Sequence, residues 1–136
     1  MKKAIISGIS GQDGAYLARL LVQQGYQVTG LVRGSQGEGL WRLKYLGIAE
    51  QVQLTECDLT DMSQIFRLIQ EIQPDEVYHL AAQSSVSVSF SQPIATINYN
   101  TISTLNLLET IRLSHASLRF YQASSSEMFG AVQRLP

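Results

Sequence analysis

Three glycines that recur at intervals of three residues could seat a phosphate group. Gly8, Gly11 and Gly14 follow an apolar run and open a stretch with apolar residues at helical spacing. A strand that turns tightly into a helix presents free N–H groups and the positive end of the helix dipole to an anion. Gly8 would permit the turn, Gly11 would let the backbone approach the phosphates, and Gly14 would let helix and strand pack closely. A glycine-rich turn without a ligand is the alternative, and the place of the turn between strand and helix favours a dinucleotide site.

The residue that follows the second apolar run predicts which dinucleotide binds. An Asp or Glu about twenty residues after the turn normally holds the ribose hydroxyls of NAD. Here Arg33 follows Val32, and the first acid after it is Glu38. A guanidinium can hold a 2′-phosphate with two hydrogen bonds, whereas a carboxylate would repel it. We therefore predict NADP, bound through Arg33 with help from Ser35 and Arg42, and a solvated loop arginine is the alternative.

Five strands that alternate with helices are needed to position these residues. Apolar and β-branched runs predict strands at 3–7, 27–32, 52–55, 76–80 and 118–122. Helical periodicity predicts helices at 13–24, 40–46, 61–72 and 93–114, with Thr60 or Asp61 as the cap of the third. This alternation predicts an α/β fold, a Rossmann-type doubly wound parallel sheet of strand order 3-2-1-4-5 with helices on both faces.

The same periodicity predicts which helix residues are buried. In the first helix these are Tyr16, Leu17, Leu20 and Leu21. In the last helix we expect Leu105, Leu107, Leu108 and Ile111 to be among the buried positions.

Polar or small residues follow the third, fourth and fifth predicted strands. They are Asp58, the segment 80–84, and Ser125 with Glu127. In a doubly wound sheet, ligands bind beyond the carboxyl ends of the strands, where the strand order reverses between strands 1 and 4. The sequence therefore predicts one site at this edge of the sheet, together with the glycine turn.

Composition excludes several other classes of protein. The formal net charge of −1 gives no electrostatic preference for nucleic acid or for a membrane surface. One cysteine, Cys57, and two histidines that lie far apart give neither a disulfide framework nor a metal site. No apolar run approaches membrane-spanning length, and the first residues are too short an apolar stretch for a signal peptide. We expect a single cytoplasmic domain over 1–136 that binds no metal.

Several stretches resemble the extended short-chain dehydrogenase/reductases and, within them, the dehydratases that act on GDP-mannose. The likeness runs in order over nearly the whole chain. Its stretches are GISGQDG at 8–14, CDLTD at 57–61, QPDEVY at 73–78, LAAQS at 80–84 and FYQASSSEMFG at 120–130. The resemblance implies conversion of GDP-mannose to GDP-4-keto-6-deoxymannose. Hydride would move from C4 of the sugar to NADP+, water would be lost across C5 and C6, and hydride would return to C6.

The resemblance also implies roles for single residues. Ser125 takes the place of a hydroxyl residue, usually Thr, near the C4 oxygen of the sugar, and Ser84 would lie near the sugar. Glu127 matches the acid/base glutamate that removes the C5 proton and helps the C6 hydroxyl to leave; without the resemblance, a surface glutamate is the more ordinary interpretation. The predicted cofactor-binding set is Gly8, Ser10, Gly11, Gln12, Asp13, Gly14, Arg33, Ser35, Asp58, Leu59, Leu80, Ala81, Ala82 and Gln83.

Other interpretations of single residues stay open beside these. Asp58 and Leu59 match the pair that holds the adenine ring, although an aspartate in this position often only starts a turn. The segment 80–83 matches the part that lies along the cofactor, although small residues also pack at strand ends. His79 is expected to be a structural histidine, and Cys57 a small buried residue.

The sequence departs from the family pattern in three places. It contains no Tyr-x-x-x-Lys pair, which the family uses to oxidise C4, and it ends at Pro136. We therefore expect a piece of a longer enzyme that is inactive alone, and a naturally short NADP-binding module is the alternative. Ser103–Thr104 stands where the family commonly has Gly-Thr, and Ile94 where it often has Tyr.

The segment Arg33–Lys44 matches a loop that reaches a neighbouring subunit in relatives. The resemblance therefore implies a homo-oligomer, with Trp41 either as a contact residue or packed within its own chain. An epimerase or a 4-keto-sugar reductase on the same fold is the alternative activity, and Glu127 separates them because neither reaction needs an eliminating carboxylate.

Overall fold

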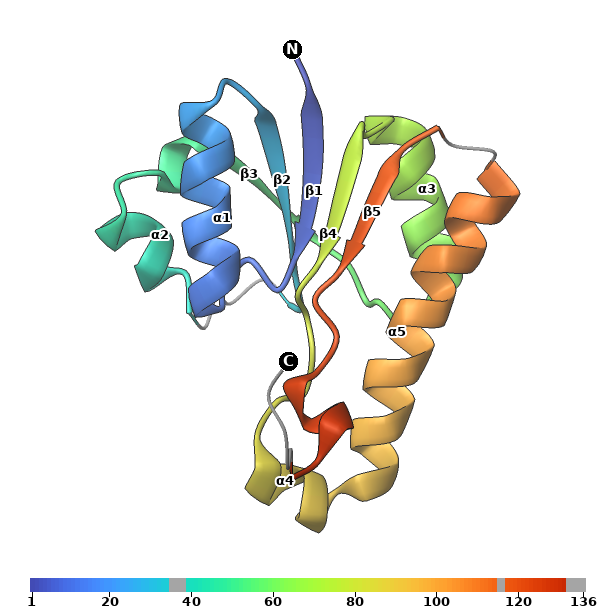
Figure 1. Cartoon of the computed structure of the whole chain (residues 1–136). Coiled ribbons are helices and arrows are strands. Elements are labelled where there is room, and N and C mark those ends of the chain that lie inside the picture. The colour runs from blue at the N-terminus through green and yellow to red at the C-terminus, as the bar shows by residue number, and fades with distance from the viewer. Residues whose placement is uncertain (35–38, 115–116, 132–136) are drawn as a thin grey trace.

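The computed structural model describes residues 1–34, 39–114 and 117–131, with the side chains of Ser126 and Glu127 left aside. Its five strands form one parallel sheet of order β3-β2-β1-β4-β5, as predicted (Figure 1). The strands are β1 (Lys3–Ser7), β2 (Gln27–Val32), β3 (Val52–Glu56), β4 (Glu76–His79) and β5 (Arg119–Gln122). The helices are α1 (Gln12–Gln23), α2 (Trp41–Tyr45), α3 (Met62–Ile72), α4 (Val86–Ser91) and α5 (Pro93–Ser114), with short 3₁₀ turns η1 (Ala49–Gln51) and η2 (Ser126–Phe129).

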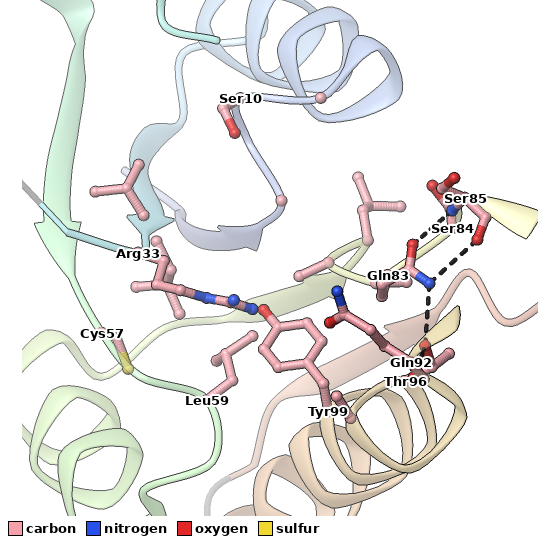
Figure 2. A pocket seen from close by; sticks show the side chains of 18 residues that line it. Ser10, Arg33, Cys57, Leu59, Gln83, Ser84, Ser85, Gln92, Thr96 and Tyr99 are labelled. Atoms are coloured by element: carbon pink, nitrogen blue, oxygen red, sulfur yellow. Dashed lines mark hydrogen bonds between the residues drawn. The ribbon is translucent and has the colours of Figure 1, made fainter. Parts of the chain in front are cut away.

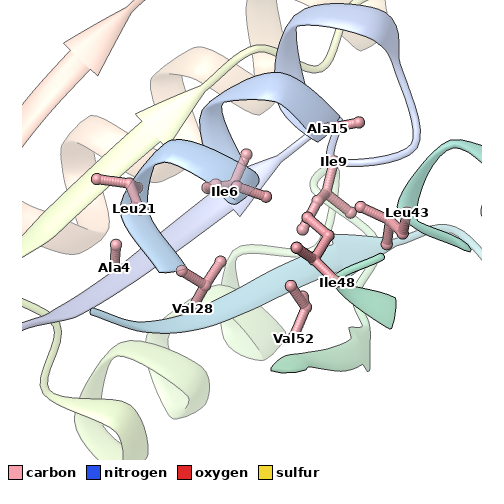
Figure 3. Close-up of a cluster of buried hydrophobic side chains, with 10 residues drawn as sticks. Ala4, Ile6, Ile9, Ala15, Leu21, Val28, Leu43, Ile48 and Val52 are labelled. Atoms are coloured by element: carbon pink, nitrogen blue, oxygen red, sulfur yellow. The ribbon is translucent and has the colours of Figure 1, made fainter. Parts of the chain in front are cut away.

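Helices cover both faces of the sheet, so the core has two parts. On one face, α1 and α2 pack over β1 and β2, where Ile6, Ile9 and Leu43 are fully buried (Figure 3). On the other face, α3 and α5 cover the sheet (Figure 1). Ile5 and Val77 are buried there with residues of both helices. Burial of apolar surface on both sides of the strands is the main stabilising contribution in such a fold.

The predicted buried face of α1 is partly wrong. Tyr16 and Leu20 are at least half exposed, and α1 instead packs on the sheet through its small residues and Leu21. A glycine and alanine face lets the helix lie closer to the sheet than a leucine stripe would allow. The buried residues of α1 are Gly14, Ala15, Ala18 and Leu21.

The predicted buried face of α5 is also partly wrong. Leu107 is buried, but Leu105 is 56% exposed and Leu108 is 47% exposed. Polar residues, Ser103 and Thr110, take the remaining buried positions. The sequence prediction also missed α4 and displaced the ends of β3, β4 and β5 by one residue.

Helix ends follow the predicted capping. Asp61 caps α3, because its carboxylate accepts hydrogen bonds from the backbone N–H groups of Ser63 and Gln64.

In the described ranges, no helix is long and apolar enough to cross a bilayer. The same ranges contain no group of three or more His, Cys, Asp or Glu side chains that could hold a metal ion.

Candidate functional site

The glycine turn joins β1 to α1 at the point where the strand order reverses. Gly8 has φ +75°, and a Cβ atom on it would lie 2.7 Å from the backbone nitrogen of Ala81. A side chain at this position would therefore separate the turn from the segment after β4. A Cβ on Gly14 would lie 2.2 Å from the Gly8 carbonyl oxygen, so the absence of a side chain lets α1 pack closely on the backbone that directly follows β1.

Helix α1 begins without a capping side chain. Its N-cap residue is Gly11, which has no side-chain acceptor for the N–H groups of the first turn. The Gly11 N–H itself donates to the Gly8 carbonyl at 3.0 Å. A helix start of this kind can accept an anion in place of a cap.

Helix α2 holds the turn from the outside. The Arg42 guanidinium donates from Nη1 to the Ser10 carbonyl oxygen at 3.0 Å and stacks on Trp41, with Cζ 4.7 Å from the ring centroid. Arg42 supports the turn through this contact and does not line the cavity described next, and its predicted help in phosphate binding stays a prediction.

A cavity of about 630 Å³ lies at the carboxyl edge of the sheet, against the glycine turn (Figure 2). We call it the first cavity. The predicted residues that line it are Gly8, Ser10, Gly11, Arg33, Leu59, Leu80, Ala81, Ala82, Gln83 and Ser84. Those that do not line it are Gln12, Asp13, Gly14 and Asp58. Ser35 lies outside the described residues.

Asp58 starts a turn, which is the alternative to adenine binding that the sequence left open. Its carboxylate accepts hydrogen bonds from the Thr60 N–H at 2.9 Å and from the Thr60 hydroxyl at 2.8 Å. These two bonds lower the pKa of Asp58, and the positive charge of Arg33 adds to that effect. Leu59, the next residue, is buried and is the one of this pair that lines the first cavity.

The segment after β4 is fixed to α5 by a side chain on each. Asn100 accepts from the Gln83 N–H at 2.8 Å and donates to the Gln83 carbonyl at 3.1 Å. The Gln83 amide donates to the Thr96 hydroxyl at 3.1 Å (Figure 2). Sequence reasoning missed this part of the site, because the partners lie on α5 and carry no motif. The cavity-lining residues that were missed are Gln92, which directly precedes α5, and Ala95, Thr96 and Tyr99 on α5.

His79 is structural, as expected, and its ring joins β1 to α5. It is 1% exposed, with Nδ1 2.6 Å from the Ser7 hydroxyl and Nε2 3.3 Å from the Ser103 hydroxyl. Every group has a partner when Ser7 donates to Nδ1, Nε2–H donates to Ser103, and Ser103 donates to the Asn100 carbonyl at 3.4 Å. Burial lowers the pKa of His79 to about 4, so the ring is neutral at pH 7.

Cys57 behaves as a small buried residue. Its thiol is 3% exposed, and burial, with a smaller effect of Asp58 and Asp61, raises its pKa to about 11. The low exposure confirms the prediction of a small buried residue, and a thiol with a raised pKa supplies almost no thiolate at neutral pH.

Arg33 and Tyr99 meet across the first cavity. The Arg33 guanidinium carbon lies 4.1 Å from the centroid of the Tyr99 ring (Figure 2). Arg33 follows β2 and Tyr99 lies on α5, so the contact depends on the tertiary fold. Ile94, one of the positions at which the sequence departs from the expected pattern, is exposed and does not line the first cavity.

A second cavity, of about 850 Å³, continues from the first and shares residues 81–85 with it. Ser125 lines it, after a bend at Ser124, which has φ +61°. Leu105 and Leu108, which are exposed, also line this cavity. Glu127 belongs by its backbone to η2, and its side chain lies outside the described part of the chain.

Comparison with known proteins identifies relatives over the whole chain. The sequence matches the family described as GDP-mannose 4,6 dehydratase over residues 5–136. The GDP-mannose 4,6-dehydratase of Yersinia enterocolitica is 46% identical over 143 residues, which cover 100% of this chain and 38% of that protein. The human GDP-mannose 4,6 dehydratase is 40% identical over 141 residues, which cover 98% of this chain and 38% of that protein. The chain therefore spans less than two fifths of the length of these curated relatives.

Solved structures share the fold. The Bordetella bronchiseptica enzyme WbmH, in complex with NAD+, matches 96% of this chain and 41% of its own with a TM-score of 0.77 and 26% identity. The UDP-glucose-4-epimerase of Stenotrophomonas maltophila, with bound NAD and formylated UDP-arabinopyranose, matches 100% of this chain and 40% of its own. Its TM-score is 0.85 and its identity is 23%, so this likeness concerns the fold alone.

Proposed function

The chain belongs to the GDP-mannose 4,6 dehydratase family, and we propose that it forms the NADP-binding part of an enzyme that converts GDP-mannose to GDP-4-keto-6-deoxymannose. The observation that carries this proposal is the pair of cavities that share residues 81–85 at the carboxyl edge of the sheet. One cavity lies against the glycine turn and the other against Ser125, as a cofactor and a sugar that exchange a hydride would require.

The first cavity fits a dinucleotide. The uncapped start of α1 at Gly11 offers backbone N–H groups to a pyrophosphate, and Leu59 offers an apolar surface to an adenine ring. The segment 80–83, held by Asn100, would lie along the rest of the cofactor. When bound, the nicotinamide would supply the hydride chemistry, by accepting a hydride and returning it.

Arg33 supports NADP rather than NAD. It lines the first cavity at the end of β2, where an acidic residue would hold the ribose hydroxyls of NAD. Its guanidinium can donate two hydrogen bonds to a 2′-phosphate. Ser35, the second predicted phosphate ligand, stays a proposal from the sequence.

The second cavity would hold the sugar. We expect the hydroxyls of Ser84 and Ser125, which line it, to donate hydrogen bonds to sugar oxygens, with Ser125 at the C4 oxygen. Glu127, two residues beyond Ser125, would take the proton from C5 and give a proton to the departing C6 hydroxyl. These roles follow the family resemblance and the place of η2 after the second cavity.

We also propose that the segment 33–44 contacts a second copy of the chain. Trp41 is 60% exposed, which agrees with a role as a contact residue. Its indole nevertheless stacks with Arg42 of its own chain, so both interpretations of Trp41 have a physical basis. Replacement of Trp41 by Ala should reduce the proportion of oligomer in sedimentation experiments if the segment is an interface.

Deuterium at C4 of GDP-mannose tests the proposed reaction. We expect the polypeptide that carries this chain to move the deuterium from C4 to C6 of the product, as read by NMR. Glu127→Gln should abolish loss of water while leaving the affinity for NADP+ unchanged. A product that keeps deuterium at C4 with inverted configuration would instead identify an epimerase and refute the dehydratase proposal.

A further inference from the structure

The contact between Arg33 and Tyr99 uses only the face of the guanidinium. Cζ lies 4.1 Å from the ring centroid, a distance at which a cation and an aromatic face attract each other. A guanidinium carries its five N–H donors in its own plane, so a stacked arginine keeps its edge free to donate. Within the described ranges, Arg33 makes no hydrogen bond or salt bridge, and its charge also acts on the nearby Asp58 carboxylate.

Tyr99 is held on a rigid support, whereas Arg33 is not. Tyr99 lies on α5 between Thr96 and Asn100, and both of these neighbours hydrogen-bond to Gln83 in the segment after β4. Arg33 is exposed and is followed by Gly34, which has φ +76°. The ring can therefore determine where the guanidinium lies, and the reverse does not hold.

We propose that Tyr99 is a positioning residue that holds the edge of Arg33 toward a phosphate ester in the first cavity. This inference rests on the proposed binding of NADP and assigns part of its selectivity to a residue of α5. Without the ring, the long arginine side chain would sample many rotamers, and each hydrogen bond to a 2′-phosphate would require more ordering. The preference for the phosphorylated nucleotide should therefore depend on the aromatic ring and not on the hydroxyl of Tyr99.

The test compares two probes, adenosine 2′,5′-bisphosphate and adenosine 5′-monophosphate, by calorimetric titration of the chain. The quantity of interest is the ratio of their affinities. Tyr99→Leu, which removes the aromatic face, should lower this ratio about two- to fivefold. Tyr99→Phe keeps the face and should retain the wild-type ratio. If the leucine variant unfolds, Tyr99→Met serves the same purpose, with the thermal midpoint as the control for folding.

Arg33→Ala separates failure of this inference from failure of the proposed function. If Arg33→Ala leaves the ratio unchanged, Arg33 does not select NADP, and both the proposed role of Arg33 and the inference on Tyr99 are refuted. If Arg33→Ala lowers the ratio and Tyr99→Leu does not, only the inference on Tyr99 is refuted. Support requires that Tyr99→Leu has no further effect on the ratio in the Arg33→Ala background. A higher affinity for both probes in Tyr99→Leu would mean that the pair obstructs the cavity, which also overturns the inference.

Discussion

Acid should destabilise this protein through His79 more than through an ordinary exposed histidine. Its ring is 1% exposed between Ser7 and Ser103, and burial lowers its pKa to about 4 from an ordinary value of about 6.5. The unfolded chain therefore binds a proton at a higher pH than the folded chain does. The stability contribution of the neutral ring is complete above the unfolded pKa and is lost as the pH falls toward 4.

The magnitude follows from the two pKa values. Relative to pH 8, the free energy of unfolding should fall by about 2 kcal/mol at pH 5 and by about 3 kcal/mol at pH 4 through this one group. Carboxylates with lowered pKa values, such as those of Asp61 and Glu76, also contribute to acid sensitivity, so the absolute slope does not isolate His79.

The assay is urea unfolding of the wild type and of His79→Asn between pH 8 and pH 4. Asparagine can accept the Ser7 hydrogen bond but does not titrate, so the difference between the two pH profiles reports the histidine. Parallel profiles would refute the reasoning. If the variant does not fold, NMR titration of the wild-type ring gives the answer directly, and a folded pKa near 6.5 would contradict it.

Two further predictions concern the turn and the opposite end of the sheet. Gly25→Ala should lower the free energy of unfolding by about 1–2 kcal/mol through backbone strain alone. The φ of Gly25 is +79°, in the left-handed region, and a Cβ atom there would meet no atom within 4 Å. Gly8→Ala should cost more and also abolish binding of NADP+, because its Cβ would strike the backbone at Ala81, and equal effects of the two variants would contradict this. Glu76→Gln should lower stability by about 1–2 kcal/mol, because Glu76 is buried and accepts from Tyr78 at 2.7 Å and from the exposed Arg119 at 2.6 Å. Affinity for NADP+ should not change in that variant, since Glu76 begins β4 and the first cavity lies beyond its end, and a weakened affinity would show that the two ends are coupled.

Local signals were enough to predict the sheet. The runs before Gly8 and Arg33 became β1 and β2, and the strand order followed from the alternation of strands and helices. The handedness of crossovers leaves few ways to arrange such a chain. The carboxyl edge, with most of the predicted lining residues, could be predicted for the same reason.

The sequence was less informative about residues whose surroundings depend on how distant elements pack together. Leu105 and Leu108 were predicted to be buried together with Leu107, yet only Leu107 is buried, and the other two line the second cavity. Leu105 and Leu108 are three residues apart and share one side of α5, whereas Leu107 lies on another side. Only the packing of α5 on α3 decided which of these two apolar sides is covered. At Asp58 the Thr60 N–H and hydroxyl both donate to Oδ1 of the carboxylate, as in a turn, and the contact with an adenine ring stays a prediction.

The sequence by itself determined the glycine turn, the parallel sheet and the place of Arg33 at a strand end, because each depends on residues close together in the chain. Only the tertiary structure decided what surrounds them. It brought Tyr99 under Arg33, Asn100 to Gln83, and Ser103 to His79. These contacts join α5 to distant strands and their following segments, and side chains brought together by packing leave no periodic signal in the sequence.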